Sequence, residues 1–356
     1  MSGLIIATGR RFGRFAVLLF VVPAFVIFCL WMMLMDTHPL WFIISGFIAL
    51  PVAMMGVAFL LSTLFAGFRR TRIEGISRQE APALWTLWEA VAGEHRAART
   101  VIVLDNQLNA GISEERTILG LLGRRIFLQI GLPLLAITDK RAFAAVLAHE
   151  DAHLRNHDTN GGLRFAEFAN SLVFVFEYAS PEETVSGKLL YMALGWLSDS
   201  FGKEQVRLSR DAEIKADRVA AQSADAVEIA RSILLIGAAN LLFKEEVYDP
   251  LERELMGAMQ APRPPLDRVL EKSALLSDRS LLNAYAGKAY AQPDDPGSTH
   301  PSCAQSLAAL GFHEKFDVEP PIKSALSEIL DSSLTERKIA EANRDWIVKV
   351  DDYLQR

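Results

Sequence analysis

The sequence predicts an α+β protein in which a mainly helical domain with a small sheet follows an N-terminal transmembrane helical hairpin. Two long uncharged runs near the N-terminus indicate the hairpin, and short β-branched runs among helical periodicities indicate the sheet. Of the 356 residues, 51% are hydrophobic, and the mean hydropathy is +0.18, which is high for a purely soluble protein. Most of this excess lies before residue 69, so a membrane-spanning part and a globular part are expected.

The two uncharged runs are long enough to cross a membrane. The first covers 21 residues from Phe15 to Met35, and the second covers 29 residues from Leu40 to Phe68. Because about 20 apolar residues cross the hydrocarbon core, transmembrane helices are expected over about 15–35 and 40–66. A cleaved signal peptide is the alternative for the first run. Its apolar core would be shorter and small residues would precede the cleavage site, whereas this run ends in Trp-Met-Met-Leu-Met.

The basic residues around the hairpin predict its orientation. The link between the runs carries no Lys or Arg, whereas three arginines precede the first run and three follow the second: Arg10, Arg11, Arg14, Arg69, Arg70 and Arg72. Positive charge favours the cytoplasmic side, so both ends of the hairpin are expected there. The sequence therefore predicts a multi-pass protein of the inner (cytoplasmic) membrane whose globular part faces the cytoplasm.

The globular part beyond Phe68 is acidic. It holds 34 of the 37 basic residues and 42 of the 43 acidic residues, which argues against nucleic acid as a partner. Cys29 lies in the first run and Cys303 in a distant loop-like stretch, so the two cysteines are poorly placed to pair. No disulfide is expected in a domain that faces the reducing cytoplasm.

Local patterns predict the order of the elements in the globular part. The predicted strands cover 101–104 and 125–132. The predicted helices cover 82–93, 140–156, 165–178, 189–201, 206–222 and 228–243, with a last helix opened by the capping box Ser333-x-x-Glu336. The stretches 165–178 and 189–201 are short and interrupted by Glu167 or Asp199. They are therefore interpreted as core or membrane-surface helices rather than as membrane spans.

The segment 148–153, Ala-His-Glu-Asp-Ala-His, carries the strongest chemical signal. His149 and His153 share one helix face, about 5–6 Å apart at Cβ, and can converge on a tetrahedral ion. Glu150 is rotated about 100° around the axis, so it can take a proton from the attacking water without binding the metal. Two exposed histidines in chance spacing are the alternative. The apolar lead-in 143–147 indicates a buried helix instead, where unpaired histidines would be costly.

A catalytic metal needs a third protein ligand beside an open position for water. His157 lies one turn beyond His153 on the same helix, too far to close around the same ion, so a surface role or a small structural role is expected for it. Glu213 and Asp217 share a helix face, and the first can ligate while the second accepts the N–H of a ligating histidine. On spacing alone such a pair is more often solvated, and a second helix must bring it to the histidines.

His-Glu-x-x-His at 149–153 followed by Ser-Arg-x-x-Glu-x-x-Ala-Asp at 209–217 resembles the HtpX heat-shock membrane proteases and the related CAAX prenyl endopeptidases. These families are gluzincins. The resemblance implies a gluzincin-type metallopeptidase domain with one catalytic Zn²⁺ ion. It implies the zinc ligands His149, His153 and Glu213, with Glu150 as the base and Asp217 supporting a ligating histidine.

The resemblance extends over about residues 80–312 and includes smaller motifs. Asn109-Ala110 resembles the start of the family's Asn-Ala-Phe-Ala strand, which is thought to pair with substrate, although Gly111 and Ile112 replace Phe and Ala here. Asp158 falls where the family has an aspartate after the helix.

His300 lies in a Thr-His-Pro motif that the family shares. This histidine could stabilise the tetrahedral oxyanion, while a structural role before Pro301 is the alternative. The family's Arg-Ile pair after this motif is replaced by Ser306-Leu307.

The resemblance implies a membrane-anchored zinc endopeptidase that acts on misfolded or damaged membrane proteins or on exposed cytoplasmic segments. Its partners would be protein or peptide substrates and the lipid bilayer. The predicted division is an anchor over 1–68, a peptidase domain over 69–312 and a C-terminal helical extension over 313–356.

Two alternatives remain for the function. The first is a membrane-bound peptide-binding chaperone or scaffold with a structural zinc, against which the intact base Glu150 argues. The second is a prenyl-protein processing peptidase, which needs an intramembrane chamber that two strong spans do not provide.

Overall fold

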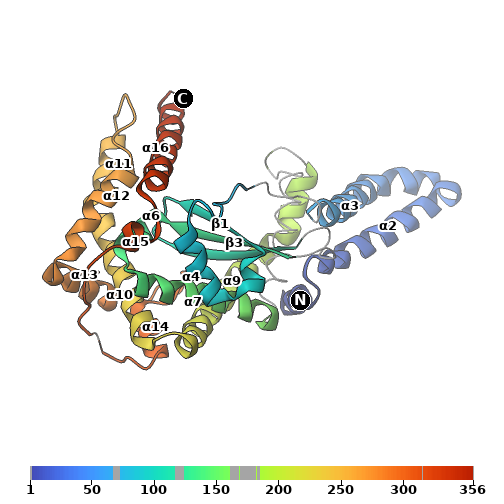
Figure 1. Cartoon of the computed structure of the whole chain (residues 1–356). Coiled ribbons are helices and arrows are strands. Elements are labelled where there is room, and N and C mark those ends of the chain that lie inside the picture. The colour runs from blue at the N-terminus through green and yellow to red at the C-terminus, as the bar shows by residue number, and fades with distance from the viewer. Residues whose placement is uncertain are drawn as a thin grey trace. The chain divides into compact units, whose positions relative to one another are not determined.

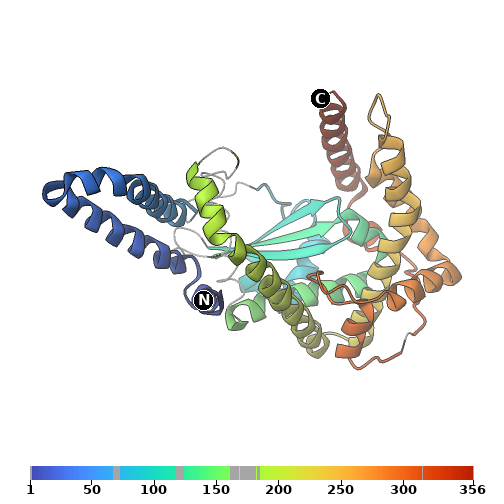
Figure 2. The same ribbon diagram turned by 180° about the vertical axis from the view of Figure 1, so that it is seen from behind.

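The computed structural model describes residues 2–66, 73–116, 124–160, 168, 182, 185–314 and 316–355. The chain forms two compact units, which are described separately below (Figures 1 and 2). Unit 1 comprises Met1–Thr71, Arg116–Gly123 and His157–Ser209, and unit 2 comprises Arg72–Glu115, Arg124–Asn156 and Arg210–Arg356. The described elements are mostly helices with one small sheet, which confirms this part of the predicted fold class.

In unit 1, the helices α2 (Leu18–Thr37) and α3 (Pro39–Ala66) lie side by side as a hairpin (Figure 1). The helices approach closely where Gly56 faces Ala24, since a Cβ on Gly56 would lie 2.6 Å from the Ala24 Cβ. Near the link, the Trp31 ring stacks on Phe42 at 4.6 Å, and its indole N–H donates to the Phe42 carbonyl at 2.9 Å. Both helices are long and apolar enough to cross a membrane.

The helix α1 (Ser2–Phe12) and the short η1 (Gly13–Val17) precede the hairpin. Their side chains join a buried cluster that includes Val17, Phe59, Phe168 and Phe201. Of the arginines that predict the orientation, Arg69, Arg70 and Arg72 lie outside the described residues, as does the side chain of Arg14.

A single long helix, α9 (Val185–Ser223), replaces the two helices predicted over 189–201 and 206–222 (Figure 2). The prediction of a break between them was wrong. Gly202 lies at that point, but an exposed glycine inside a helix costs only about 1 kcal/mol relative to alanine, and the helix continues through it. The stretch 165–178 lies outside the described residues apart from Phe168.

The sheet of unit 2 has the strand order β1-β3-β2, with β1 (Thr100–Asp105) parallel to β3 (Arg124–Gly131) and β2 (Ala110–Arg116) at one edge. Ile102 pairs with Leu128 across the parallel ladder, and both side chains are fully buried. The two strands predicted from β-branched alternation are therefore confirmed. The strand implied by the resemblance at Asn109-Ala110 begins at Ala110 as β2.

The main core of unit 2 joins the sheet to the helices α4 (Pro82–Ala92) and α7 (Lys140–Asn160). Trp88 of α4 is fully buried, and its indole N–H donates to the Thr100 hydroxyl of β1 at 3.0 Å, so its polar atom is satisfied. Phe143 and Leu147 of α7 are fully buried in the same cluster as Leu128. The sheet therefore supports the helix that carries the two motif histidines.

A second core cluster surrounds α10 (Ala226–Phe243). Leu234, Leu235 and Leu242 of α10 are buried with Leu282 and Ala286 of α13 (Arg279–Ala291). The segment Ala226–Leu255, which begins with α10, is also long and apolar enough to cross a membrane, but 61% of its most apolar window is buried against other parts of the protein.

The remaining described elements are short except for the C-terminal helix. This helix starts at Ser332 with Asp331 in the N-cap position, so the predicted capping box Ser333-x-x-Glu336 was wrong. Asp and Ser are both favoured at an N-cap, and the extended backbone of Asp331 places Ser333 inside the first turn. The C-terminal helix is α16 (Ser332–Leu354). The remaining short elements are α5 (Glu94–Ala97), α6 (Leu132–Ile137), η2 (Lys244–Tyr248), α11 (Asp249–Leu255), α12 (Pro265–Ser273), η3 (Ala274–Ser277), α14 (Cys303–Ala309) and α15 (Ala325–Ile329).

Candidate metal centre

The helix α7 begins at a charged cap. The Asp139 carboxylate accepts the backbone N–H groups of Arg141 and Ala142 at 3.1 and 2.9 Å, which confirms the predicted helix start. Its other oxygen accepts from the buried guanidinium of Arg231 on α10 at 2.6 Å. Arg231 also donates to Glu228 at 2.9 Å. The start of α7 is thus tied to α10 by a buried ionic network.

Alanines set the spacing between α7 and the unit 2 part of α9. Ala145, Ala148 and Ala152 of α7 are buried in one cluster with Ala216 and Ala220 of α9. Because these side chains are small, the two helix backbones can approach closely, and longer side chains would force them apart. This packing brings the second motif of the sequence to the first.

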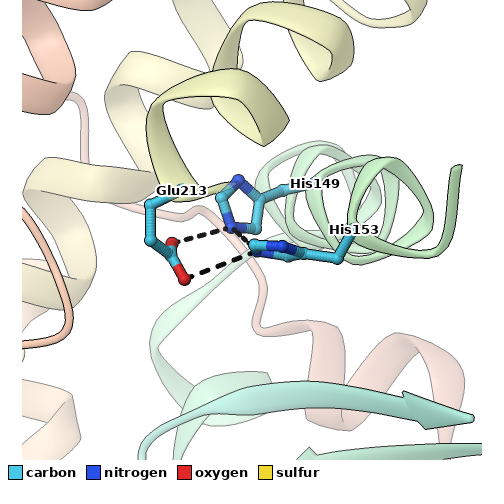
Figure 3. Close-up of side chains that lie close together, drawn as sticks. All are labelled: His149, His153 and Glu213. Carbon is cyan, nitrogen blue, oxygen red and sulfur yellow. Dashed lines mark hydrogen bonds and ion pairs between the residues drawn. The ribbon is translucent and has the colours of Figure 1, made fainter. Parts of the chain in front are cut away.

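The ligand atoms of His149, His153 and Glu213 converge at this helix contact (Figure 3). The two Nε2 atoms are 3.0 Å apart. The Glu213 carboxylate lies 3.3 Å from His149 Nε2 through Oε2 and 3.5 Å from His153 Nε2 through Oε1. All three side chains are largely shielded from solvent, and their donor set could hold a metal ion.

Asp217 fixes the orientation of one histidine. Its carboxylate lies 2.9 Å from His149 Nδ1 and is almost completely buried. A carboxylate accepts only from a protonated ring nitrogen, so a neutral His149 presents its Nε2 lone pair to His153 and Glu213. A supporting carboxylate of this kind raises the basicity of a metal-ligating imidazole.

The buried charges shift the protonation of these groups. Burial opposes the charged form of His149, but the hydrogen bonds with Asp217 and Glu213 outweigh it and raise its pKa well above the ordinary value. Burial would likewise raise the pKa of Glu213, but its hydrogen bonds to His149, His153 and His300 hold that pKa far below its usual range. Burial raises the pKa of Glu150, although the neighbouring histidines oppose the rise.

His300 approaches the centre from a different segment. Its Nδ1 lies 3.4 Å from Glu213 Oε1, and this contact raises the pKa of the imidazole. The His300 side chain is 65% exposed, so most of it faces solvent. The structure thus brings together His149, Glu150, His153, Glu213, Asp217 and His300.

Other predicted site residues are not joined to the centre by the described contacts. Asn109 and Ala110 lie at the start of β2, where the Asn109 carbonyl accepts the Gly131 N–H at 2.9 Å. A Cβ on Gly131 would lie only 1.6 Å from the Gln107 carbonyl oxygen, so glycine is required for this approach. The side chains of His157 and Asp158 lie outside the described residues.

Asp151, inside the histidine motif, is a buried residue that sequence reasoning missed. Its carboxylate lies 3.1 Å from Arg96 Nε of α5 and accepts from Arg155 at 2.6 Å. The spacing of Asp151 and Arg155 by four residues is a signal that the sequence does contain. Arg96, 55 residues earlier, gives no such signal.

Residues 100–311 of the chain match Peptidase family M48. The matched region contains both helices of the candidate metal centre and the segment of His300. No curated protein and no solved structure shows significant similarity to the chain.

Proposed function

Because this chain belongs to Peptidase family M48, we propose that it is a membrane-anchored zinc endopeptidase in which Glu150 is the general base. The family assignment supports a metallopeptidase. The observation that carries the finer proposal is the convergence of His149, His153 and Glu213 from two helices, with the buried Glu150 beside them.

The donor set fits zinc. Imidazole nitrogens and a carboxylate are ligands that zinc takes in catalytic sites with a fourth position left for water. Donor atoms on one tetrahedral zinc ion, each about 2.0–2.1 Å from it, are themselves about 3.3 Å apart. The three separations between the atoms of His149, His153 and Glu213 are 3.0, 3.3 and 3.5 Å. These values support a single tetrahedral ion rather than a purely ionic cluster.

Each of these protein groups has a separate role in peptide hydrolysis. When bound, zinc supplies Lewis acidity toward a water molecule and a peptide carbonyl. Glu150 takes one proton from the water molecule while the water oxygen bonds to the carbonyl carbon. Glu150 then delivers the proton to the amide nitrogen as the C–N bond breaks. Asp217 holds the His149 ring in the tautomer that the centre needs. His300, which lies beside Glu213 and is largely exposed, donates to the oxyanion.

The division of the chain follows from the same proposal. Residues 1–68 form the anchor, 69–312 the peptidase domain and 313–356 a C-terminal extension. Residues 100–311, which match the family, support the middle part. Leu334 of α16 is buried in the main core cluster, so the extension belongs to the packed fold of unit 2. The strand at Asn109-Ala110 is a candidate to pair with an extended substrate, because β2 lies at an edge of the described sheet.

The membrane hairpin suggests where the substrates lie. The arginines that flank the two spans favour the inner membrane with the peptidase domain in the cytoplasm. Misfolded membrane proteins and exposed cytoplasmic segments are then within reach, which fits a role in protein quality control.

The test is the degradation of casein by the purified full-length protein. We expect cleavage that a chelator abolishes and that added Zn²⁺ restores. Glu150→Gln should retain one metal ion per chain while turnover falls by about 10²–10⁴-fold, the usual contribution of a general base. Casein cleavage by Glu150→Gln at the wild-type rate would show that another group activates the water.

A further inference from the structure

Arg210 lies on α9 one turn before the candidate ligand Glu213. Its guanidinium donates to the Asp295 carbonyl at 2.9 Å, to the Asp294 carboxylate at 2.6 Å and to the Gln305 side-chain oxygen at 2.7 Å. The Arg210 side chain is only 17% exposed. Three acceptors that lie 84 to 95 residues further along the chain therefore meet at one side chain.

These acceptors flank His300 on both sides in the sequence. Asp294 and Asp295 precede it, and Gln305 follows it in α14, where Ser302 and Gln305 form a capping box. Within this segment, His300 donates its backbone N–H to the Ser298 hydroxyl at 3.1 Å. The segment 294–305 is thus held at both ends by the guanidinium, and the imidazole lies between the two points of attachment.

Among the described residues, few contacts hold the His300 ring in place. Its side chain is 65% exposed, and the contact with Glu213 at 3.4 Å is a long one. Arg210 and Glu213 lie three residues apart on the same helix, so they share a face and are neighbours. One turn of α9 therefore carries both the carboxylate that His300 approaches and the arginine that holds the segment of His300.

An ion pair between a surface arginine and an acidic neighbour ordinarily contributes little to the stability of the fold. Arg210 differs because it donates to three acceptors, one of them a backbone carbonyl, from a planar fork of fixed geometry. A lysine has a single ammonium group on a flexible chain and cannot reproduce all three contacts in one plane. The geometry therefore specifies an arginine, and not merely a positive charge.

We propose that Arg210 is a positioning residue that clamps the segment 294–305 and thereby keeps His300 beside Glu213. The catalytic consequence rests on the function proposed above, whereas the clamp itself does not. If His300 stabilises the oxyanion, its displacement by about 1 Å lowers turnover up to about 10²-fold. Arg210→Ala should then lower kcat by about 10- to 100-fold, with a smaller change in KM.

The first measurement is hydrogen exchange of the purified full-length protein, which does not depend on activity. In Arg210→Ala, peptides that cover 293–305 should exchange several-fold faster, while peptides of α7 stay unchanged. Arg218→Ala, an exposed arginine on the same helix, is the matched control and should alter neither region. Equal exchange of 293–305 in wild type and Arg210→Ala would overturn the clamp.

The second measurement is a double-mutant cycle on casein hydrolysis with His300→Ala. If Arg210 acts through His300, Arg210→Ala should have almost no further effect on kcat in the His300→Ala background. Arg210→Lys should fall between wild type and Arg210→Ala. Additive losses would overturn the proposal, since Arg210 would then act independently of His300. Unchanged kcat in Arg210→Ala, or loss of bound metal from that variant, would overturn it as well.

The two measurements separate the two proposals. If wild-type protein shows no metal-dependent cleavage, the proposed function fails, and hydrogen exchange still decides whether Arg210 clamps the segment. If cleavage is metal-dependent and exchange is unaffected by Arg210→Ala, the function stands and the clamp is wrong.

Discussion

In α3, large apolar side chains such as Phe47 and Ile48 are exposed, whereas in α10 the ionisable side chains of Glu228 and Arg231 are buried. Both helices lie in segments long and apolar enough to cross a membrane. In the most apolar window, 17% of the α3 segment is buried within the protein, against 61% of the segment that begins with α10. Length and hydropathy therefore do not distinguish the two helices, but their surroundings do.

Contact between water and the exposed apolar face of α3 is unfavourable. Because the length of this helix matches the thickness of the hydrocarbon core of a bilayer, we expect lipid to cover this face. The apolar face of α10 is already covered by protein, and its buried charges are paired with each other and with Asp139. A buried charge without a partner would be costly, so the pairs are part of what keeps α10 inside the domain.

The helix α7 extends the comparison to the candidate centre. Glu150, Asp151 and His153 are all buried on it. Asp151 has arginine partners, whereas His153 belongs with His149 and Glu213 to a group of donor atoms that could hold a metal ion. The departures from ordinary burial in this protein thus correspond to different partners: lipid for the hairpin, arginine for the buried acids and, in the function proposed above, a metal for the histidines.

The largest effect on stability is expected from Arg231→Leu. This change makes α10 more apolar, but it leaves Asp139 and Glu228 without their buried partner. Breaking a buried ionic network from one side costs about 3–5 kcal/mol of unfolding free energy. Urea unfolding of the purified protein in detergent, followed by circular dichroism, measures this loss.

Arg141→Leu is the matched control for this prediction. Arg141 also contacts Glu228, at 2.8 Å, but its side chain is 75% exposed. An exposed pair contributes about 0–1 kcal/mol, so the control should unfold almost like wild type. Equal losses in the two variants would show that burial does not set the value of the network.

A smaller effect, on membrane insertion, is expected from Phe47→Lys in α3. A lysine at the centre of a span raises the apparent insertion free energy by about 2.5–3.5 kcal/mol. A larger fraction of the molecules should therefore fail to insert this helix. Val227→Lys in α10 is the comparison, since Val227 is partly exposed at the start of a helix that we place inside the domain. Insertion of the two variants into microsomes is the measurement, and an equal defect would identify α10 as a third span.

The smallest perturbation is a single cysteine that reports the orientation of the hairpin. With Cys29 and Cys303 replaced by serine, Thr37→Cys in the link should react with an impermeant maleimide in intact cells. Ser77→Cys should react only after the inner membrane is broken. The reverse pattern would place the candidate centre outside the cytoplasm and make envelope proteins the substrates.

Much of the local structure is predictable from the sequence because its causes are local. The alternation of Ile126, Leu128 and Ile130 predicts β3, and the helix predicted from residue 140 starts there as α7. Local signals fail where two neighbouring residues compete. Asp331 and Ser333 are both good N-caps, and the helix starts after the first, with Leu334 buried in the core.

The candidate centre is predictable only in part. The spacing of His149 and His153 predicts a shared site, because both lie on one helix. Glu213 is implied by resemblance alone, since nothing in its own neighbourhood indicates that the alanines of α7 and α9 bring it to the histidines. Arg210 and Arg231 are further cases, because Arg210 meets its three acceptors 84 to 95 residues away and Arg231 meets Asp139 92 residues away in the chain.

The central claim is that one metal ion is held between two helices, and metal content tests it most directly. Purified wild-type protein should contain one zinc ion per chain by elemental analysis. Glu213→Ala should lose it, and Asp217→Asn should bind zinc about 10–100-fold more weakly. His157→Ala should keep one ion per chain. Full zinc content in Glu213→Ala together with its loss in His157→Ala would place the site on α7 alone and contradict the account.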